Sequence, residues 1–193
     1  MCDYGSDSKW TSVIIHEYIY APHEIRWTSF YERLISEGVV ALVGHFRLKK
    51  YSHLFSPSSQ ISFVRKPLAR TASEFLHETR QSSRMTRNFE EYIELPEMRN
   101  RQSKLLKGFE NGAFIGVTEL YPESIHLINA RFRLNLRVLK RNQAPKGGAA
   151  KFLQDLPQSV VKRYDELNRI DNEIYRTCRA NIERNLSELG ANK

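Results

Sequence analysis

The sequence predicts an α/β fold in which a central parallel sheet is flanked by helices. Short apolar runs rich in Val, Ile and Phe alternate along the chain with longer segments whose apolar residues recur at helical spacing. The run at residues 39–43 is apolar throughout, which is typical of a strand buried on both faces of a parallel sheet. Alternation of strands and helices predicts right-handed crossovers between parallel strands. A chain of 193 residues is long enough for a single domain, 1–193, with a sizeable core.

The first elements are predicted from residue type and from helix-stop signals. Residues 1–11 are expected to form a flexible N-terminus, and the β-branched and aromatic stretch at 13–20 favours a strand. A helix is expected from about residue 28 to residue 37. Gly38 should end this helix, because glycine readily adopts the left-handed conformation of a helix C-cap.

The middle of the chain is predicted to continue the alternation. A strand at 61–64 should bury Phe63 and Val64, and Pro67 should start a helix, since proline is tolerated in the first helical turn. The elements expected from there on are helices at 67–81, 88–94 and 97–107, a strand at 113–118, a helix at 121–132 and a strand at 135–139.

The C-terminal quarter is predicted to hold a loop and one long helix. Residues 140–158 contain two prolines and two glycines among several cations, which indicates a mobile basic loop. Residues 159–189 should form a single amphipathic C-terminal helix that packs against the sheet. Its apolar stripe consists of Val160, Tyr164, Leu167, Ile174, Cys178, Ile182 and Leu186.

Composition indicates which classes of partner and which cell compartment to expect. The formal net charge of +8 favours an anionic partner, but no nucleic-acid-binding motif is present, so nucleic acid is not expected. The chain has no run of 18 apolar residues and its start lacks the basic and apolar regions of a signal peptide, which predicts no membrane association. Cys2 and Cys178 form neither a disulfide framework nor a metal-site spacing, which favours the cytoplasm and no metal. Nothing in the sequence indicates an oligomeric state.

Arg65 and Ser73 are the first candidates for ligand binding. Arg65 follows the strand at 61–64 and so lies at its carboxyl end, where open α/β sheets place their ligands. Ser73 lies about two turns into the next helix, so both side chains reach one anion if it lies along the helix flank. The spacing alone favours a surface arginine and an ordinary helix serine.

Residues 61–75 resemble the 3′-phosphate-binding motif of sulfotransferases that use 3′-phosphoadenosine 5′-phosphosulfate (PAPS), a strand followed by R-x-P-x-x-R-x-x-S-x-F/Y. Residues 88–92 and 100–106 resemble the F-E-E-F/Y and N-x-Q-S/T-R/K-x-L runs of the carbohydrate sulfotransferases, heparan-type and bacterial. Residues 114–124 resemble their G-V/L-T-E-x-x-x-E-S segment, and the whole resemblance covers about 39–186. It implies a P-loop-type three-layer sandwich and PAPS as co-substrate.

The resemblance also assigns roles to single residues. Arg65 and Ser73, with Arg70, fall on the positions of the motif that binds the 3′-phosphate. His45, in a Gly-His-Phe segment, matches the histidine proposed as the base that takes the acceptor proton. Lys146 lies before two glycines, like the basic segment that closes over the cofactor, although a plain flexible linker also fits these residues.

The loop expected to bind the 5′-phosphosulfate departs from the family pattern. Relatives carry a glycine-containing lysine loop, whereas this chain has no glycine there and places His23 at the lysine position, with Glu24 next to it. Thr28 and Ser29 remain as hydroxyl donors at the helix start, and His23 or Arg26 is left to supply the missing cation.

Two functions therefore stay open at the level of sequence. The first is transfer of a sulfuryl group from PAPS to a hydroxyl of a saccharide or similar acceptor. The second is a catalytically inactive sulfotransferase-like protein that binds an anionic ligand or a protein partner.

Overall fold

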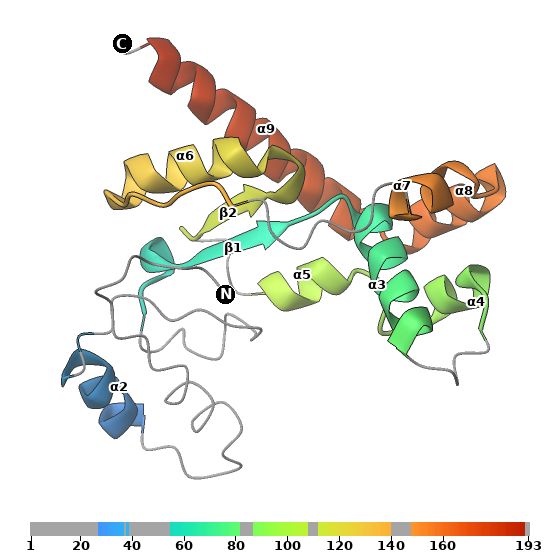
Figure 1. Ribbon diagram of the computed structural model, residues 1–193, viewed down its shortest axis with the longest axis horizontal. Coiled ribbons are helices and arrows are strands. Elements are labelled where there is room, and N and C mark those ends of the chain that lie inside the picture. Colours follow the sequence, from blue (N-terminus) through green and yellow to red (C-terminus); the bar gives the residue numbers. More distant parts are fainter. Residues whose placement is uncertain are drawn as a thin grey trace.

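The described part of the chain is mainly helical and contains a two-stranded parallel sheet (Figure 1). The computed structural model describes residues 27–36, 38, 55–81, 87–107, 112–139 and 148–191. The strands are β1 (Ile61–Val64) and β2 (Phe114–Val117), and single 3-10 turns lie at η2 (Pro57–Ser59) and η3 (Thr118–Leu120). The helices are α2 (Trp27–Ser36), α3 (Pro67–Gln81), α4 (Phe89–Glu94), α5 (Arg101–Leu106), α6 (Tyr121–Phe132), α7 (Gly148–Gln154), α8 (Gln158–Leu167) and α9 (Arg169–Ala191).

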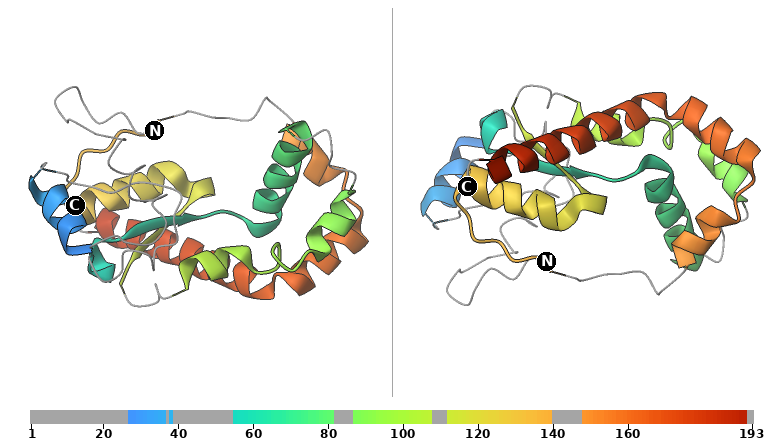
Figure 2. Two further views of the ribbon diagram at one scale, coloured as in Figure 1. Left: turned by 90° about the horizontal axis from the view of Figure 1, so that it is seen from below. Right: turned by 90° about the horizontal axis from the view of Figure 1, so that it is seen from above.

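The two strands confirm the α/β prediction in its coarse form. They pair in parallel, with Ile61 opposite Phe114 and Val64 opposite Val117. Helices α6 and α9 both contact β2 and lie on opposite sides of the strands (Figure 2). The strands expected at 13–20 and 39–43 and the flexible N-terminus expected at 1–11 lie outside the described residues.

Apolar side chains gather in two separate clusters. The strand cluster joins the sheet to α6 and α9 and consists of Val64, Phe114, Val117, Ile125, Leu127, Ile128, Tyr175 and Ile182. The helix cluster joins α3, α4 and α8 and consists of Ala72, Phe75, Phe89, Tyr92, Ile93, Met98, Val160 and Tyr164. The described chain therefore has a sheet-containing end and an all-helical end, which α9 and the β1 to α3 connection join (Figure 1).

Local signals place several element boundaries correctly. Helix α3 begins at Pro67 and ends at Gln81, and α6 covers residues 121–132, as predicted. Gly38 has φ +64° and its N–H donates to the Ile35 carbonyl at 3.0 Å, so it ends α2 in the predicted left-handed cap. Asn88 and Glu91 form a reciprocal capping box at the start of α4, because each side chain accepts from the other residue's backbone N–H.

The strand predicted at 135–139 is wrong, since residues 134–139 have no regular structure. The side chain of Asn129, on α6, hydrogen-bonds to the backbone of this segment. Its Oδ1 accepts from the Leu136 N–H at 2.8 Å and its Nδ2 donates to the Leu136 carbonyl at 2.9 Å. Both backbone groups of Leu136 are thus taken by a side chain and are not available to a neighbouring strand.

The loop predicted at 140–158 is wrong for its second half. Residues 148–154 form helix α7, and Phe152 packs against the helix cluster with its ring centroid 5.1 Å from that of Phe89. This aromatic contact gives the segment an apolar anchor that the glycine and proline content did not reveal. Residues 140–147, with Lys146, lie outside the described part of the chain.

The single helix predicted at 159–189 is two helices that meet at Asn168. Its side chain turns back, with Nδ2 donating to the Tyr164 carbonyl at 3.1 Å and Oδ1 accepting from the Asn100 N–H at 2.8 Å. The apolar stripe is accordingly divided, with Val160 and Tyr164 in the helix cluster and Ile182 in the strand cluster.

Two further predictions need correction. The helix expected at 97–107 is shorter, α5, because residues 96–100 form a turn that ends with Asn100 at φ 48°. Phe63 is 36% exposed rather than buried, whereas Val64 is 1% exposed as predicted. The Phe63 ring lies over Gly116 of β2 and beside Tyr121, with ring centroids 5.7 Å apart.

Candidate functional site

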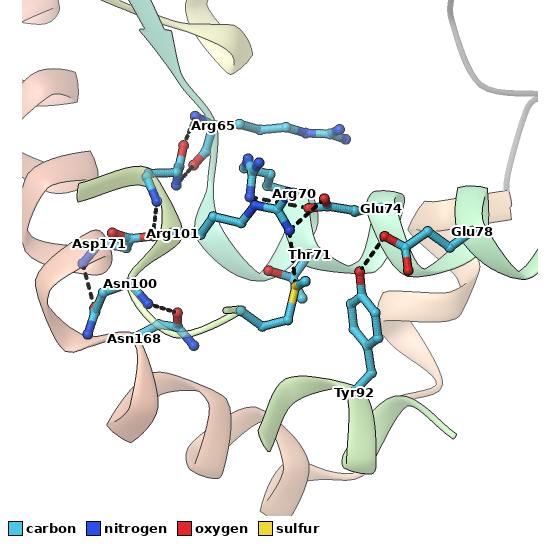
Figure 3. A network of polar contacts seen from close by, with 12 residues as sticks. Arg65, Arg70, Thr71, Glu74, Glu78, Tyr92, Asn100, Arg101, Asn168 and Asp171 are labelled. Carbon is cyan, nitrogen blue, oxygen red and sulfur yellow. Dashed lines mark hydrogen bonds and ion pairs between the residues drawn. The ribbon is translucent and has the colours of Figure 1, made fainter. Parts of the chain in front are cut away.

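The candidate site begins at Arg65, which follows the last residue of β1 at the carboxyl end of the sheet. Its backbone is fixed by one side chain from α5. The Arg65 N–H donates to Gln102 Oε1 at 2.8 Å, and Gln102 Nε2 donates to the Arg65 carbonyl at 2.9 Å. Because the backbone is held from one side, the Arg65 side chain extends away from it and remains 38% exposed (Figure 3).

One acidic side chain lies close to Arg65. Glu119 comes from η3, directly after β2, so the carboxyl ends of the two parallel strands meet here. Glu119 Oε1 accepts from the Lys66 N–H at 2.9 Å and lies 4.0 Å from Arg65 Nε. A half-exposed ion pair of this length contributes little, about 0–1 kcal/mol, and leaves the guanidinium able to bind another anion.

A second group of charges lies on the flank of α3. Glu74 lies between two arginines, with Oε1 2.8 Å from Arg101 Nη1 and Oε2 3.4 Å from Arg70 Nη1 (Figure 3). Since two cations share one carboxylate, this flank keeps an excess of positive charge near Arg65. An anion bound here would find fixed cations rather than a neutral surface.

Ser73 is half-buried on α3, three residues after Arg70, so the two lie on one flank of the helix. Among the described residues, none hydrogen-bonds the Ser73 hydroxyl. The structure thus brings Arg65, Arg70 and Ser73 into one strand-to-helix unit. Arg70 differs from the expectation because it already has Glu74 as an ion-pair partner.

The remaining predicted site residues cannot be placed relative to Arg65. His23, Arg26, His45 and Lys146 lie outside the described residues. Thr28 and Ser29 fall in the first turn of α2, of which the backbone alone is described at these positions. In the described ranges, no group of three or more His, Cys, Asp or Glu residues is arranged to hold a metal ion.

A buried polar network behind Arg65 was not predicted from the sequence as part of the site. Asp171, 2% exposed, accepts from the backbone N–H groups of Gln102 at 2.8 Å and Ser103 at 2.7 Å, which are two of the free donors in the first turn of α5. Asn100 does the same for α9, since its Oδ1 accepts from the N–H groups of Ile170 at 3.1 Å and Asp171 at 3.2 Å. The starts of α5 and α9 therefore cap each other (Figure 3).

The sequence contained one signal for this network. The N-x-Q run at 100–102 is part of the family resemblance, and the structure shows which groups Asn100 and Gln102 bond to. Asp171 and Asn168 carry no comparable local pattern, because their partners lie about 70 residues earlier in the chain.

Two buried tyrosines near α3 are unsuited to act as bases. The hydroxyls of Thr71 and Tyr164 are hydrogen-bonded at 2.8 Å, and burial raises the pKa of Tyr164 to about 12. Burial, followed by the nearby charge of Glu74, also raises the pKa of Tyr92, whose hydroxyl donates to Glu78 at 3.1 Å. Both phenols stay protonated at neutral pH.

A groove of about 850 Å³ lies elsewhere, between α5, β2 and α9. Apolar side chains such as Phe114 and Ile174 line it, together with Lys104, Lys107 and Cys178, whose thiol pKa is raised by burial. Arg65, Arg70 and Ser73 are not among its lining residues. The groove is therefore separate from the Arg65 site.

No helix in the described ranges is both long enough and apolar enough to cross a membrane. Comparison of the chain with family models, with curated proteins and with solved structures found no match in any of the three.

Proposed function

We propose that this protein is a sulfotransferase that moves a sulfuryl group from PAPS to a hydroxyl of a saccharide or similar acceptor. The observation that carries the proposal is that three segments of the sequence resemblance adjoin at Arg65. The first contains Arg65 itself, the second supplies Gln102 to its backbone, and the third supplies Glu119 to its side chain. Three motifs far apart in the sequence thus contribute to one position at the carboxyl end of parallel strands.

In the proposed complex, Arg65 and Ser73 hold the 3′-phosphate and Arg70 adds positive charge beside it. The exposed guanidinium and the hydroxyl of Ser73, which has no partner among the described residues, suit a phosphate, which accepts charge-assisted hydrogen bonds. Glu119 competes for Arg65, so binding requires the guanidinium to exchange a weak contact for a stronger one.

The proposed reaction forms a bond between the acceptor oxygen and sulfur while the bond from sulfur to the 5′-phosphate oxygen breaks. His45 takes the acceptor proton, and 3′-phosphoadenosine 5′-phosphate (PAP) leaves with the bonding electrons. Thr28 and Ser29, with His23 or Arg26, stabilise the charge on the leaving oxygen, and Lys146 closes over the cofactor. This proposal includes a P-loop-type three-layer sandwich, in which the strands expected at 13–20 and 39–43 extend the β1–β2 pair.

The proposal predicts that PAP binds more tightly than adenosine 5′-phosphate. A charge-assisted hydrogen bond contributes roughly 1.5–3 kcal/mol, so Arg65→Ala should weaken PAP binding about 10- to 100-fold and leave adenosine 5′-phosphate nearly unchanged. Isothermal titration calorimetry measures both. Arg163→Ala is the matched control, because it removes an exposed arginine that pairs with Glu94 on α4. Equal affinity of the wild type for the two nucleotides would remove the 3′-phosphate site from consideration.

The altered loop at 22–29 favours the second candidate function, an inactive sulfotransferase-like protein that binds an anionic ligand or a protein partner. A transfer assay separates the two. The enzyme should convert PAPS to PAP in the presence of saccharide acceptors, whereas the inactive protein should leave PAPS intact whether or not it binds PAP.

A further inference from the structure

Gln102 makes an unusual pair of contacts. It is 5% exposed, and both ends of its amide bond to the backbone of one residue, Arg65, which lies 37 positions earlier. A buried glutamine that served only to fill space would not need to match the backbone donor and the backbone acceptor of the same residue. The match fixes the two groups on either side of the Arg65 Cα atom, from which the guanidinium extends.

Gln102 is itself held in place by the mutual caps of α5 and α9. Asp171 accepts from the Gln102 N–H at 2.8 Å, and Asn100 accepts from two N–H groups at the start of α9. These bonds prevent α5 from sliding along its axis without losing buried hydrogen bonds. The position of the Gln102 amide is therefore set by the start of α9.

We propose that Gln102 is a positioning residue for anion binding: it fixes the Arg65 backbone so that the guanidinium is already aimed at the 3′-phosphate before the nucleotide arrives. The inference rests on the proposed function, since it names the residue that orients the 3′-phosphate ligand. A misplacement of about 1 Å at such a group costs a large part of its contribution. Loss of Gln102 should thus affect the 3′-phosphate and not the rest of the nucleotide.

The test uses the ratio of PAP affinity to adenosine 5′-phosphate affinity, measured by calorimetry on the full chain. Gln102→Met keeps the length and apolar stem of the side chain and removes both hydrogen bonds to Arg65. The ratio should fall about tenfold, while adenosine 5′-phosphate affinity changes less than about twofold. Gln102→Glu keeps an acceptor for the Arg65 N–H but sets a carboxylate oxygen against the Arg65 carbonyl, where the amide donated, and it should also lower the ratio. It also serves if the methionine variant fails to fold.

The control is Thr71→Val, which removes a buried hydrogen bond of α3, to Tyr164, without touching the Arg65 backbone. It should lower thermal stability and keep the affinity ratio. Hydrogen exchange of the Arg65 amide, followed by NMR, supplies a second readout. Exchange should accelerate in Gln102→Met by more than its loss of global stability explains, and in Thr71→Val by no more than that loss.

The outcomes separate this inference from the proposed function. If the wild type prefers PAP and Gln102→Met keeps the full preference, the positioning role is wrong and the 3′-phosphate site stands. An equal loss of affinity for both nucleotides in Gln102→Met would likewise overturn the positioning role, because it would reflect general destabilisation. If the wild type shows no preference for PAP, both ideas fail together.

Discussion

The buried polar residues in the described part of the molecule are hydrogen-bonded, except that the Oε1 atom of Gln60 has no partner there. The six such residues are Gln60, Thr71, Gln102, Ser124, Asn168 and Asp171, and each makes at least one hydrogen bond. An unsatisfied buried group costs about 1–3 kcal/mol, so these residues can be buried because their partners are fixed. Most of these partners are backbone groups, so each of these residues keeps its hydrogen bonds only while that backbone stays in place.

Alkaline pH should destabilise the protein through Tyr164. Its pKa is about 12 in the folded chain because burial disfavours the phenolate, whereas an unfolded tyrosine has a pKa near 10. Between these values the folded state binds more protons than the unfolded state, so the free energy of unfolding falls as pH rises from about 10 to about 12. The loss attributable to Tyr164 is roughly 2–3 kcal/mol across this window.

Urea unfolding at a series of pH values, on the wild type and on Tyr164→Phe, measures this effect. The phenylalanine variant has no hydroxyl to titrate at this position, so its stability should decline less steeply above pH 10. Parallel curves for the two proteins would contradict the assigned cause. The comparison also cancels the contribution of Tyr92, whose pKa is raised in both.

At the scale of elements, the break between α8 and α9 lets one stretch of chain serve both apolar clusters. Helix α8 supplies Val160 and Tyr164 to the helix cluster, and α9 supplies Tyr175 and Ile182 to the strand cluster. A continuous helix would direct one straight stripe toward a single neighbour. The turn at Asn168 changes the direction between the two clusters, and the same residue accepts a hydrogen bond from the start of α5.

Strand β2 depends on glycine at position 116. A Cβ atom there would lie 2.5 Å from the Phe63 ring, so Gly116→Ala should force the ring away from Tyr121 and destabilise the fold by about 1–3 kcal/mol. Thermal or urea unfolding measures the change. Gly190→Ala is the control, because its Cβ would meet open space on α9, and it should be neutral or stabilising by up to about 1 kcal/mol.

Removal of the ring should rescue the alanine variant. In the Phe63→Ala background the space above residue 116 is empty, so adding Gly116→Ala should then cost little. A double-mutant cycle that shows no coupling between the two positions would mean that the ring does not restrict position 116.

At the scale of the whole molecule, the candidate site lies where the sheet-containing end and the all-helical end of the described structure meet. Arg65 connects β1 of the strand cluster to α3 of the helix cluster, and the buried polar network joins α5 to α8 and α9 directly behind it (Figure 3). Ligand sites are common at such junctions, because polar groups there are held by elements on both sides.

The proposed reaction further requires that the N-terminal part of the chain brings His45 to this junction. His45→Ala should lower sulfuryl transfer by about 10²- to 10⁴-fold and leave PAP affinity nearly unchanged, since a general base acts on the acceptor and not on the nucleotide. The measurement combines a transfer assay with calorimetry. His77→Ala, at an exposed position of α3, should retain both properties. Full activity of His45→Ala would exclude this histidine as the base.

The sequence by itself determined the elements whose causes are local. The apolar run at 61–64, the proline at the first position of α3 and the glycine after α2 act within a few residues, so strand β1, helix α3 and the cap at Gly38 could all be predicted. The parallel strand pair and Arg65 at its carboxyl end could also be predicted from alternation and order.

Only the tertiary structure decided the features whose partners are distant. The contact between Phe89 and Phe152 anchors the helix at 148–154, and Asn100 meets the Asn168 turn 68 residues later. The bonds from Asn129 to the Leu136 backbone span only seven residues, but they too depend on how the chain turns after α6. The two hydrogen bonds between the Gln102 side chain and the Arg65 backbone also join segments that are distant in the sequence. Each of these features depends on a hydrogen bond or contact between segments that come together only in the packed fold. The local sequence pattern does not show which segments will be neighbours.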